Sequence, residues 1–190
     1  MSQSPDGAVA RPQRRTLLLL LALFFAPLAV AFTLYYGFGW RPSSLSIHGK
    51  LVSPVRPMPE AAQKLRGDWS LVYVGDGGCD QDCRTALVFA RQTHLSLAKE
   101  MSRLSRVMLV TGNCCDVDYF KKEHDGIKVF DVSALEEKTE LMAVLPDVDL
   151  KYTLFVVDPL GNLVMRYDVR ESPAGLLDDL RKLLKLSHIG

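Results

Sequence analysis

Two cysteines lie four residues apart in the stretch "GDGGCDQDCR", directly after the apolar run "WSLVYV". Cys79 and Cys83 are two of only 4 cysteines in the chain. Such a pair can form a stable disulfide, exchange thiol for disulfide, or bind Cu(I) through soft thiolates. Residues four apart on a helix have Cβ atoms about 5–6 Å apart, whereas a disulfide prefers about 3.8 Å. We therefore expect Cys79 to lie in the turn just before a helix.

The other two cysteines, Cys114 and Cys115, are adjacent in "TGNCCD" and follow the apolar run "RVMLV". They are auxiliary candidates, either as thiols or as copper ligands, and pairing with each other or with the first pair stays open. His124, in "KKEHDG", is the histidine best placed to join them. His94 is expected on the face of a helix.

The chain has 190 residues and a net charge of +1, which predicts one domain of ordinary size and no nucleic-acid partner. Its run "TLLLLLALFFAPLAVAFTLYY" has no charged residue and, at about 1.5 Å per residue, is long enough to cross a hydrocarbon core of about 30 Å. We expect a transmembrane helix over residues 16–40. Arginines at positions 11, 14 and 15 predict that residues 1–15 form a cytoplasmic tail.

The alternative for this run is a cleaved signal peptide, whose apolar core is usually only about 7–15 residues long. In both cases the rest of the chain is exported. An oxidising compartment allows a cysteine pair to form a disulfide and keep it.

The proline-rich residues 41–66 are expected to form a periplasmic linker, in which "HGKLVSPVRPMP" resembles a docked edge segment. Residues 67–190 are expected to form one domain. Its predicted elements, in order, are a strand at 68–75, a helix at 84–104, a strand at 106–112, a turn-rich stretch, a strand in "KVFDV", a helix in "ALEEKTELMAVL", a hairpin at 152–169 around "DPLGN", and a helix in "SPAGLLDDLRKLLKL".

This order predicts an α/β domain whose sheet is parallel at first and antiparallel at its end. In such a sheet the loops after the carboxyl ends of parallel strands meet at one edge, where ligands bind. Both cysteine pairs follow such strands. We therefore expect all four sulfurs on the same side of the sheet.

A strand, a cysteine pair at the start of a helix, and a closing hairpin with "VVDPLGN" resemble the thioredoxin-like fold. The Cys-x-x-x-Cys spacing and the single anchor resemble the Sco/SenC family, membrane-tethered copper proteins that help to assemble cytochrome c oxidase. The resemblance spans Asp68 to Leu186. It implies a mixed sheet with flanking helices after one transmembrane helix, and a bacterial inner-membrane protein with its C-terminal domain in the periplasm. It also implies Cu(I) as a candidate cofactor and, as partner, the oxidase subunit that carries the dinuclear copper site.

The sequence departs from that family at one ligand. The Sco family has a histidine that binds copper shortly before the strand leading into the Asp-Pro-x-Gly turn, and the matching region "LPDVDLKYTLFVVDPLG" contains no histidine. Only Cys79 and Cys83 match family site residues. They are the candidates both for catalysis and for Cu(I) binding.

The expected function is thiol–disulfide exchange or Cu(I) handling in oxidase biogenesis, with the missing histidine favouring exchange. Whether the protein is an enzyme stays open; as one, it would be a thiol–disulfide oxidoreductase. One alternative is a non-catalytic assembly or docking factor with a structural disulfide. Another is a peroxide-reducing enzyme, which Asp76, Asp80 and Asp82 make less favourable because nearby carboxylates disfavour a thiolate.

Overall fold

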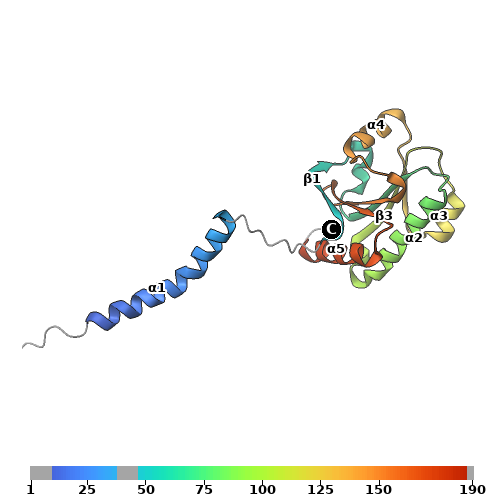
Figure 1. Ribbon diagram of the computed structural model, residues 1–190. Helices are drawn as coiled ribbons and strands as arrows, with labels where there is room; N and C mark the ends of the chain where they lie inside the picture. Colours follow the sequence, from blue (N-terminus) through green and yellow to red (C-terminus); the bar gives the residue numbers. More distant parts are fainter. Residues whose placement is uncertain (1–9, 38–46, 188–190) are drawn as a thin grey trace, which may run out of the picture. The chain divides into compact units, whose positions relative to one another are not determined.

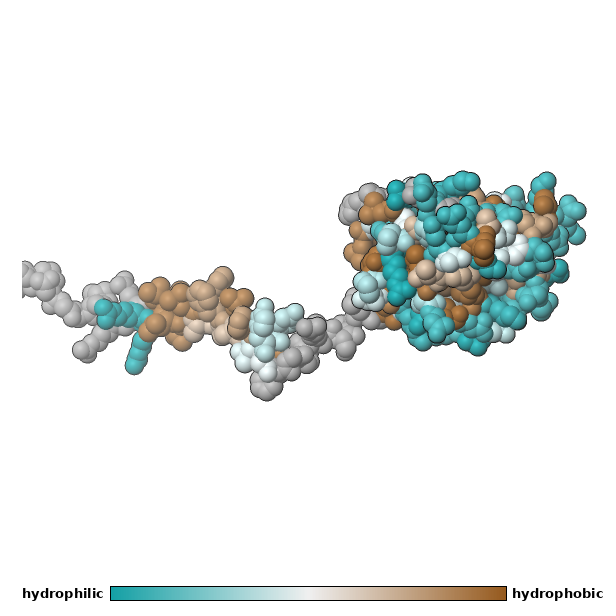
Figure 2. Space-filling view, turned by 90° about the horizontal axis from the view of Figure 1, so that it is seen from above, coloured by the Kyte–Doolittle hydropathy of each residue, from teal (hydrophilic) through white to brown (hydrophobic). Residues whose placement is uncertain are grey.

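The computed structural model describes residues 10–37 and 47–187, which belong to two compact units that divide between Ser46 and Ile47. In the first unit, helix α1 runs over Ala10–Phe32 and continues as the π-helix η1, Thr33–Gly37. The segment Arg14–Gly37 is long and apolar enough to cross a membrane, and Figure 2 shows a hydrophobic surface over its middle part, between a hydrophilic start and a paler end. Residues 38–40 of the predicted span and residues 1–9 of the predicted tail lie outside the described part.

The second unit contains a six-stranded sheet in the order β1-β6-β5-β2-β3-β4. Strand β2 pairs in parallel with β3, and β3 in parallel with β4, whereas the β2–β5, β5–β6 and β1–β6 pairs are antiparallel. The mixed sheet that the sequence predicts is therefore confirmed. The strands are β1 Lys50–Pro57, β2 Trp69–Gly75, β3 Leu104–Val110, β4 Lys128–Asp131, β5 Thr153–Val157 and β6 Asn162–Asp168.

Helices cover both faces of this sheet (Figure 1). Alternate residues of a strand point to opposite faces, so Leu71 packs into one hydrophobic core and Val72 into the other. The core with Leu71 is closed by α2 Gln81–Ser96, α3 Val117–Glu123 and α5 Pro173–Leu186. The opposite core is closed by α4 Leu135–Val144 and the 3₁₀ helix η2 Glu60–Leu65. Two further 3₁₀ helices are η3 Ala98–Arg103 and η4 Leu150–Tyr152.

The predicted linker over residues 41–66 is wrong for residues 50–57, which form the edge strand β1 paired with β6. Proline is tolerated in an edge strand because its missing N–H costs no ladder bond there, and the register shifts between Leu51 and Arg56, on either side of Pro54. The docked edge segment is thus confirmed, and the compact unit begins at Ile47 rather than at residue 67.

The start of this unit is fixed by a buried carboxylate on α5. Asp179 is 2% exposed, and its Oδ2 accepts hydrogen bonds of 2.8 Å from the backbone N–H groups of His48 and Gly49. An ionised acceptor makes stronger hydrogen bonds than a neutral one. Asp179 therefore attaches the segment that enters β1 to the C-terminal helix.

Two helical details differ from the sequence prediction. The helix expected at 84–104 begins earlier, at Gln81, and ends at Ser96, after which the chain continues as η3. The turn-rich stretch contains α3, which no prediction placed; it is only 7 residues long, and the side chain of its N-cap Asp116 accepts a hydrogen bond from the N–H of Tyr119. So short a helix shows too few turns for an apolar periodicity to be visible.

Candidate functional site

Cys79 and Cys83 are joined by a disulfide at the start of α2, with their Cα atoms 5.1 Å apart. Cys79 lies in the turn before the helix, as the geometric argument predicts, and its φ of +46° is uncommon for a residue other than glycine. Asp80 is the N-cap: its Oδ1 accepts a hydrogen bond of 3.0 Å from the N–H of Cys83. The cap fixes the turn that carries Cys79 relative to the helix that carries Cys83.

The loop with Cys114 and Cys115 lies directly against this turn. The two carboxylate oxygens of Asp76 accept hydrogen bonds from the N–H of Gly78 (2.8 Å) and from the N–H of Asn113 (3.1 Å). The carbonyl of Gly77 accepts a further bond of 3.0 Å from the N–H of Asp116. The loops after β2 and β3 are therefore connected by hydrogen bonds. All four cysteines lie beyond the carboxyl ends of these two strands, on the same side of the sheet.

Gly77 is required for this contact between the loops. A Cβ atom at Gly77 would collide with the carbonyl oxygen of Asn113 and would lie 2.8 Å from the Cα of Cys114. Those are backbone atoms, which cannot turn aside as the end of a flexible side chain can. Only glycine lets the backbones of the two cysteine loops approach so closely.

The two cysteine pairs nevertheless line different cavities. Cys79 and Cys83 line a cavity of about 370 Å³ together with Tyr73, Leu150 and Lys151. Cys114 and Cys115, which are paired with each other, line a cavity of about 480 Å³ together with residues that include Val117, Phe120, His124 and Val129. His124 thus shares a cavity with the second pair and does not line the cavity of the first.

The surroundings of the first pair combine negative charge with a cation. Asp82 accepts a hydrogen bond of 3.2 Å from the hydroxyl of Tyr152, and Arg84 donates one of 3.1 Å from Nε to the carbonyl of Cys79. Burial raises the pKa of Tyr73 well above its ordinary value, and the charges of Asp80 and Asp82 raise it further. Tyr73 therefore stays a neutral phenol, whose hydroxyl lies 3.5 Å from the carbonyl of Lys151 and donates to it.

The histidines have other partners. The Nε2 atom of His94 lies 2.9 Å from the carbonyl of Leu104, and the Nδ1 atom of His48 lies 3.4 Å from Asp179. His124 is 1% exposed, with its Nε2 2.9 Å from the hydroxyl of Tyr119. Burial lowers the pKa of His124, and the charges of Arg106 and Arg91 lower it further, so its imidazole is neutral at neutral pH.

Within residues 10–37 and 47–187, no group of three or more histidine, cysteine, aspartate or glutamate side chains is arranged to hold a metal ion. The segment before β5, where the resemblance places a copper-binding histidine, contributes Leu150 and Lys151 to the cavity wall beside Cys79 and Cys83. Among the described residues, Cys79 and Cys83 do not belong to a group of three or more such side chains.

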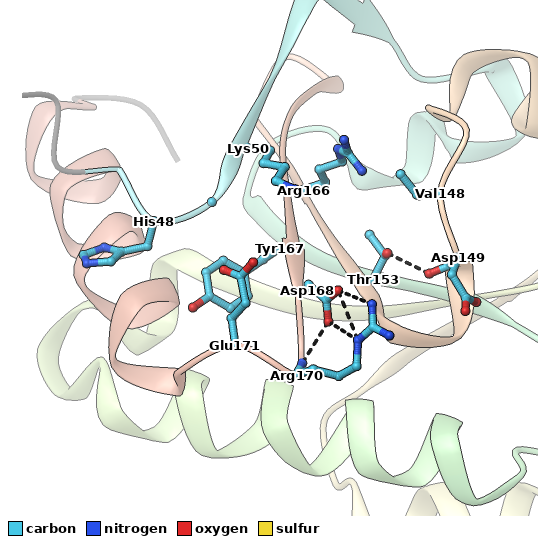
Figure 3. Close-up of a pocket in the computed structure, with 11 residues that line it drawn as sticks. His48, Lys50, Val148, Asp149, Thr153, Arg166, Tyr167, Asp168, Arg170 and Glu171 are labelled. Carbon is cyan, nitrogen blue, oxygen red and sulfur yellow. Dashed lines mark hydrogen bonds and ion pairs between the residues drawn. The ribbon is translucent and has the colours of Figure 1, made fainter. Parts of the chain in front are cut away.

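A third cavity, of about 230 Å³, lies between β1 and the segments around β6 and contains no cysteine. Its wall includes the ion pair of Asp168 and Arg170, and the ring of His48 points away from that pair (Figure 3). Lys50 and Arg166 are cross-strand partners in β1 and β6. This cavity therefore offers no thiol chemistry.

Several residues of the first cavity were not predicted from the sequence. The sequence indicates only a buried strand for Tyr73, and only a stretch without a ligand for Leu150 and Lys151. The available signal for Lys151 was the position of the missing family histidine. From the sequence Asp76 is only a negative charge near the cysteines, whereas in the structure its hydrogen bonds connect the two loops.

Comparison with known proteins identifies the family. Residues 69–187 match the family model described as "Transmembrane-like, thioredoxin-like, C-terminal domain". The chain belongs to this family. The thioredoxin-like fold is thereby confirmed, and together with helix α1 the description of this transmembrane-like family indicates a single-pass membrane protein. A search of curated proteins gave no match.

The structures that resemble this transmembrane-like, thioredoxin-like chain include Sco proteins. Yeast Sco1 with copper bound superposes with a TM-score of 0.57 at 17% identity, over 66% of this chain and 84% of that one. Apo Sco1 from Thermus thermophilus gives 0.56 at 18% identity, over 71% and 95%. Arabidopsis thaliana ScoI with copper bound gives 0.51 at 16% identity, over 66% and 89%. The resemblance to Sco proteins is confirmed at the level of the fold.

Proposed function

We propose that this protein is anchored in the bacterial inner membrane, with its thioredoxin-like domain in the periplasm. There it would act in cytochrome c oxidase biogenesis by thiol–disulfide exchange at Cys79 and Cys83. The observation that carries the proposal is the position of the pair, which is joined at the first turn of α2 and lines a cavity of about 370 Å³. The Sco-like fold supports the oxidase subunit with the dinuclear copper site as the partner.

The reaction runs from the reduced pair. The thiolate of Cys79 attacks a disulfide of the partner, forming a mixed disulfide and releasing one partner thiolate, which takes up a proton. Cys83 then attacks the sulfur of Cys79, so that the second partner thiol is released and the Cys79–Cys83 disulfide forms. Two electrons pass to the partner, whose copper-binding cysteines are thereby kept reduced.

The N-terminus of α2 supports this chemistry. The partial positive charge of a helix N-terminus stabilises a thiolate, and the guanidinium of Arg84 is held at the carbonyl of Cys79. Asp80 and Asp82 act in the opposite direction, because carboxylates disfavour a second negative charge. The cavity is the route by which a partner sulfur reaches the pair.

Exchange is favoured over copper delivery because of what surrounds the two sulfurs. A Sco-type site needs a third ligand, and the wall that should supply it contains Leu150 and Lys151. Neither of these side chains supplies the soft donor atom that Cu(I) prefers. Binding of Cu(I) by the two thiolates alone is the alternative, since soft sulfur ligands select this ion.

A second candidate function is that of a docking factor in which the disulfide is only structural. The observation that favours it is burial: Cys79 is 1% exposed and Cys83 is 2% exposed. A disulfide so shielded would persist without turnover. The oxidase would then recognise the surface of the domain rather than its sulfurs.

The deciding experiment compares two matched double variants of the full chain in detergent. Reduced, anaerobic wild type, Cys79→Ser/Cys83→Ser and Cys114→Ser/Cys115→Ser are titrated with Cu(I) against a competing chelator and separately equilibrated in glutathione redox buffers. We expect a reversible two-electron transition that only the first variant loses, without tight copper binding. Tight one-to-one Cu(I) binding lost only in that variant would instead make the protein a copper carrier. Oxidase assembly that survives Cys79→Ser/Cys83→Ser in cells would remove both roles and leave the docking factor.

A further inference from the structure

The cavity beside Cys114 and Cys115 is a groove between α3 and β4. Its apolar walls come from Val117 and Phe120 on α3 and from Ile127 and Val129 at β4. Its volume of about 480 Å³ suits side chains of a bound polypeptide. Half-exposed Val117 lies two residues after Cys115, so the apolar wall begins at the thiol pair.

The groove runs along an edge of the sheet. Strand β4 is the last strand in the order, and within the described residues it pairs only with β3. Ile127, Val129 and Asp131 alternate along the chain and all line the groove, so one face of the edge strand is turned toward it. An extended peptide that pairs with such an edge places every second side chain on the same face.

The cysteines at the end of the groove define what it would bind. Cys114 is exposed and Cys115 is half-buried, in contrast to the fully buried first pair. Thiol and disulfide groups react with one another by exchange, so the fitting occupant carries a cysteine. The apolar walls and the free strand edge specify the rest of it as an extended apolar chain.

We propose that Cys114 and Cys115 form a second thiol–disulfide exchange site. Its substrate is an extended, apolar, cysteine-bearing segment of a partner protein that binds along β4 in the groove. This site is independent of Cys79 and Cys83, which line a different cavity.

In the oxidised site, a substrate thiolate attacks the Sγ atom of Cys114. The Cys114–Cys115 bond breaks, a mixed disulfide forms, and Cys115 leaves as a thiolate that takes up a proton. A second substrate thiolate then attacks the substrate sulfur of the mixed disulfide, giving a substrate disulfide and the reduced pair. Two electrons move from substrate to protein, and the reverse sequence reduces a substrate disulfide.

The test uses the full chain carrying Cys79→Ser/Cys83→Ser, so that failure of the first site cannot affect the result. The reduced protein is mixed with a short peptide rich in valine and threonine, whose single cysteine is coupled to thionitrobenzoate. Attack by Cys114 on the peptide sulfur releases coloured thionitrobenzoate, and Cys115 then displaces the peptide thiol. The comparison probe is glutathione coupled to the same group.

We expect the peptide probe to react about tenfold faster than the glutathione probe, which corresponds to about 1.4 kcal/mol of groove binding. Methylating alternate backbone nitrogens of the peptide should remove this advantage, because it blocks strand pairing without altering the protein. Val129→Glu should do the same, whereas Leu135→Glu, which places the same charge on an exposed residue outside the groove lining, should not.

Three results would overturn the proposal. The first is equal rates for the peptide and the glutathione probe. The second is a peptide rate that backbone methylation leaves unchanged, a result that does not depend on whether Val129→Glu folds. The third is release of thionitrobenzoate no faster than from a variant with all four cysteines replaced by serine.

Discussion

Replacing Gly77 by alanine tests whether the contact between the two cysteine loops holds the site together. The added Cβ would meet the carbonyl oxygen of Asn113 and lie 2.8 Å from the Cα of Cys114 and 3.0 Å from Cγ1 of Val110. The φ of Gly77 is not positive, so alanine can adopt its backbone conformation and the cost of the substitution is steric alone. Gly78→Ala is the matched control: its Cβ would lie 3.2 Å from one carboxylate oxygen of Asp76, and no other atom outside its two chain neighbours is within 4 Å.

The expected magnitude follows from this difference. Overpacking a well-packed region costs about 1–3 kcal/mol. We expect the cost at Gly77 to lie at the upper end of this range, because the added Cβ would collide with backbone atoms. Any gain from replacing glycine, about 0.4–1 kcal/mol through the unfolded chain, is common to both variants and cancels in the comparison. We expect Gly77→Ala to be less stable than Gly78→Ala by about 2–3 kcal/mol, a difference in Tm of about 8–12 °C at about 4 °C per kcal/mol.

The assay is thermal unfolding of the full chain in detergent, followed by near-ultraviolet circular dichroism. The rate at which dithiothreitol reduces each protein serves as a second readout. Separation of the loops in Gly77→Ala should expose both cysteine pairs and raise that rate. Equal melting temperatures and equal reduction rates for the two variants would refute the view that Gly77 joins the loops.

Two further predictions concern carboxylates of the domain. Asp179→Asn should lower the free energy of unfolding by about 1–3 kcal/mol, because a neutral amide oxygen accepts the N–H bonds of His48 and Gly49 more weakly than an ionised carboxylate oxygen does. Asp178→Asn, at an exposed position, should change it little, and urea midpoints measure both. The hydrogen bond from Arg170 lowers the pKa of Asp168 below its ordinary 3.8, so the pair stabilises the fold above that pH and loses its effect as pH falls through the lower folded value. Asp168→Asn should therefore cost at most about 1 kcal/mol at neutral pH, and a cost that stays constant below pH 3.8 would contradict an electrostatic origin.

Most of the fold could be predicted because its elements have strong local patterns. The buried strands β2 and β3 are continuous apolar runs, and the hairpin of β5 and β6 surrounds a turn with proline and glycine. Strand β1 was harder, because its prolines are typical of a linker and its pairing with β6 depends on residues more than 100 positions away. Helix α3 was missed because 7 residues make two turns at most.

The candidate site was predictable only where the geometry is local. The position of Cys79 before the helix follows from the reach of a disulfide across four residues. The wall formed by Leu150 and Lys151 does not, because it depends on β5 lying next to β2 in the sheet. The separation of the two cysteine pairs into different cavities also depends on the strand order. A local sequence pattern does not show which strands or helices lie on each side of a loop.

The strand order explains why the two cysteine pairs can work separately although their loops are in contact. The first pair follows β2, and its cavity is closed by η4, which leads into β5 on one side of β2. The second pair follows β3, and its cavity is closed by α3 and β4 on the opposite side. A partner bound at one cavity therefore contacts different elements from a partner bound at the other. Because the loops between them are joined at Gly77 and Asp76, a change that separates them should affect both pairs, whereas serine substitutions in one pair should affect only that pair.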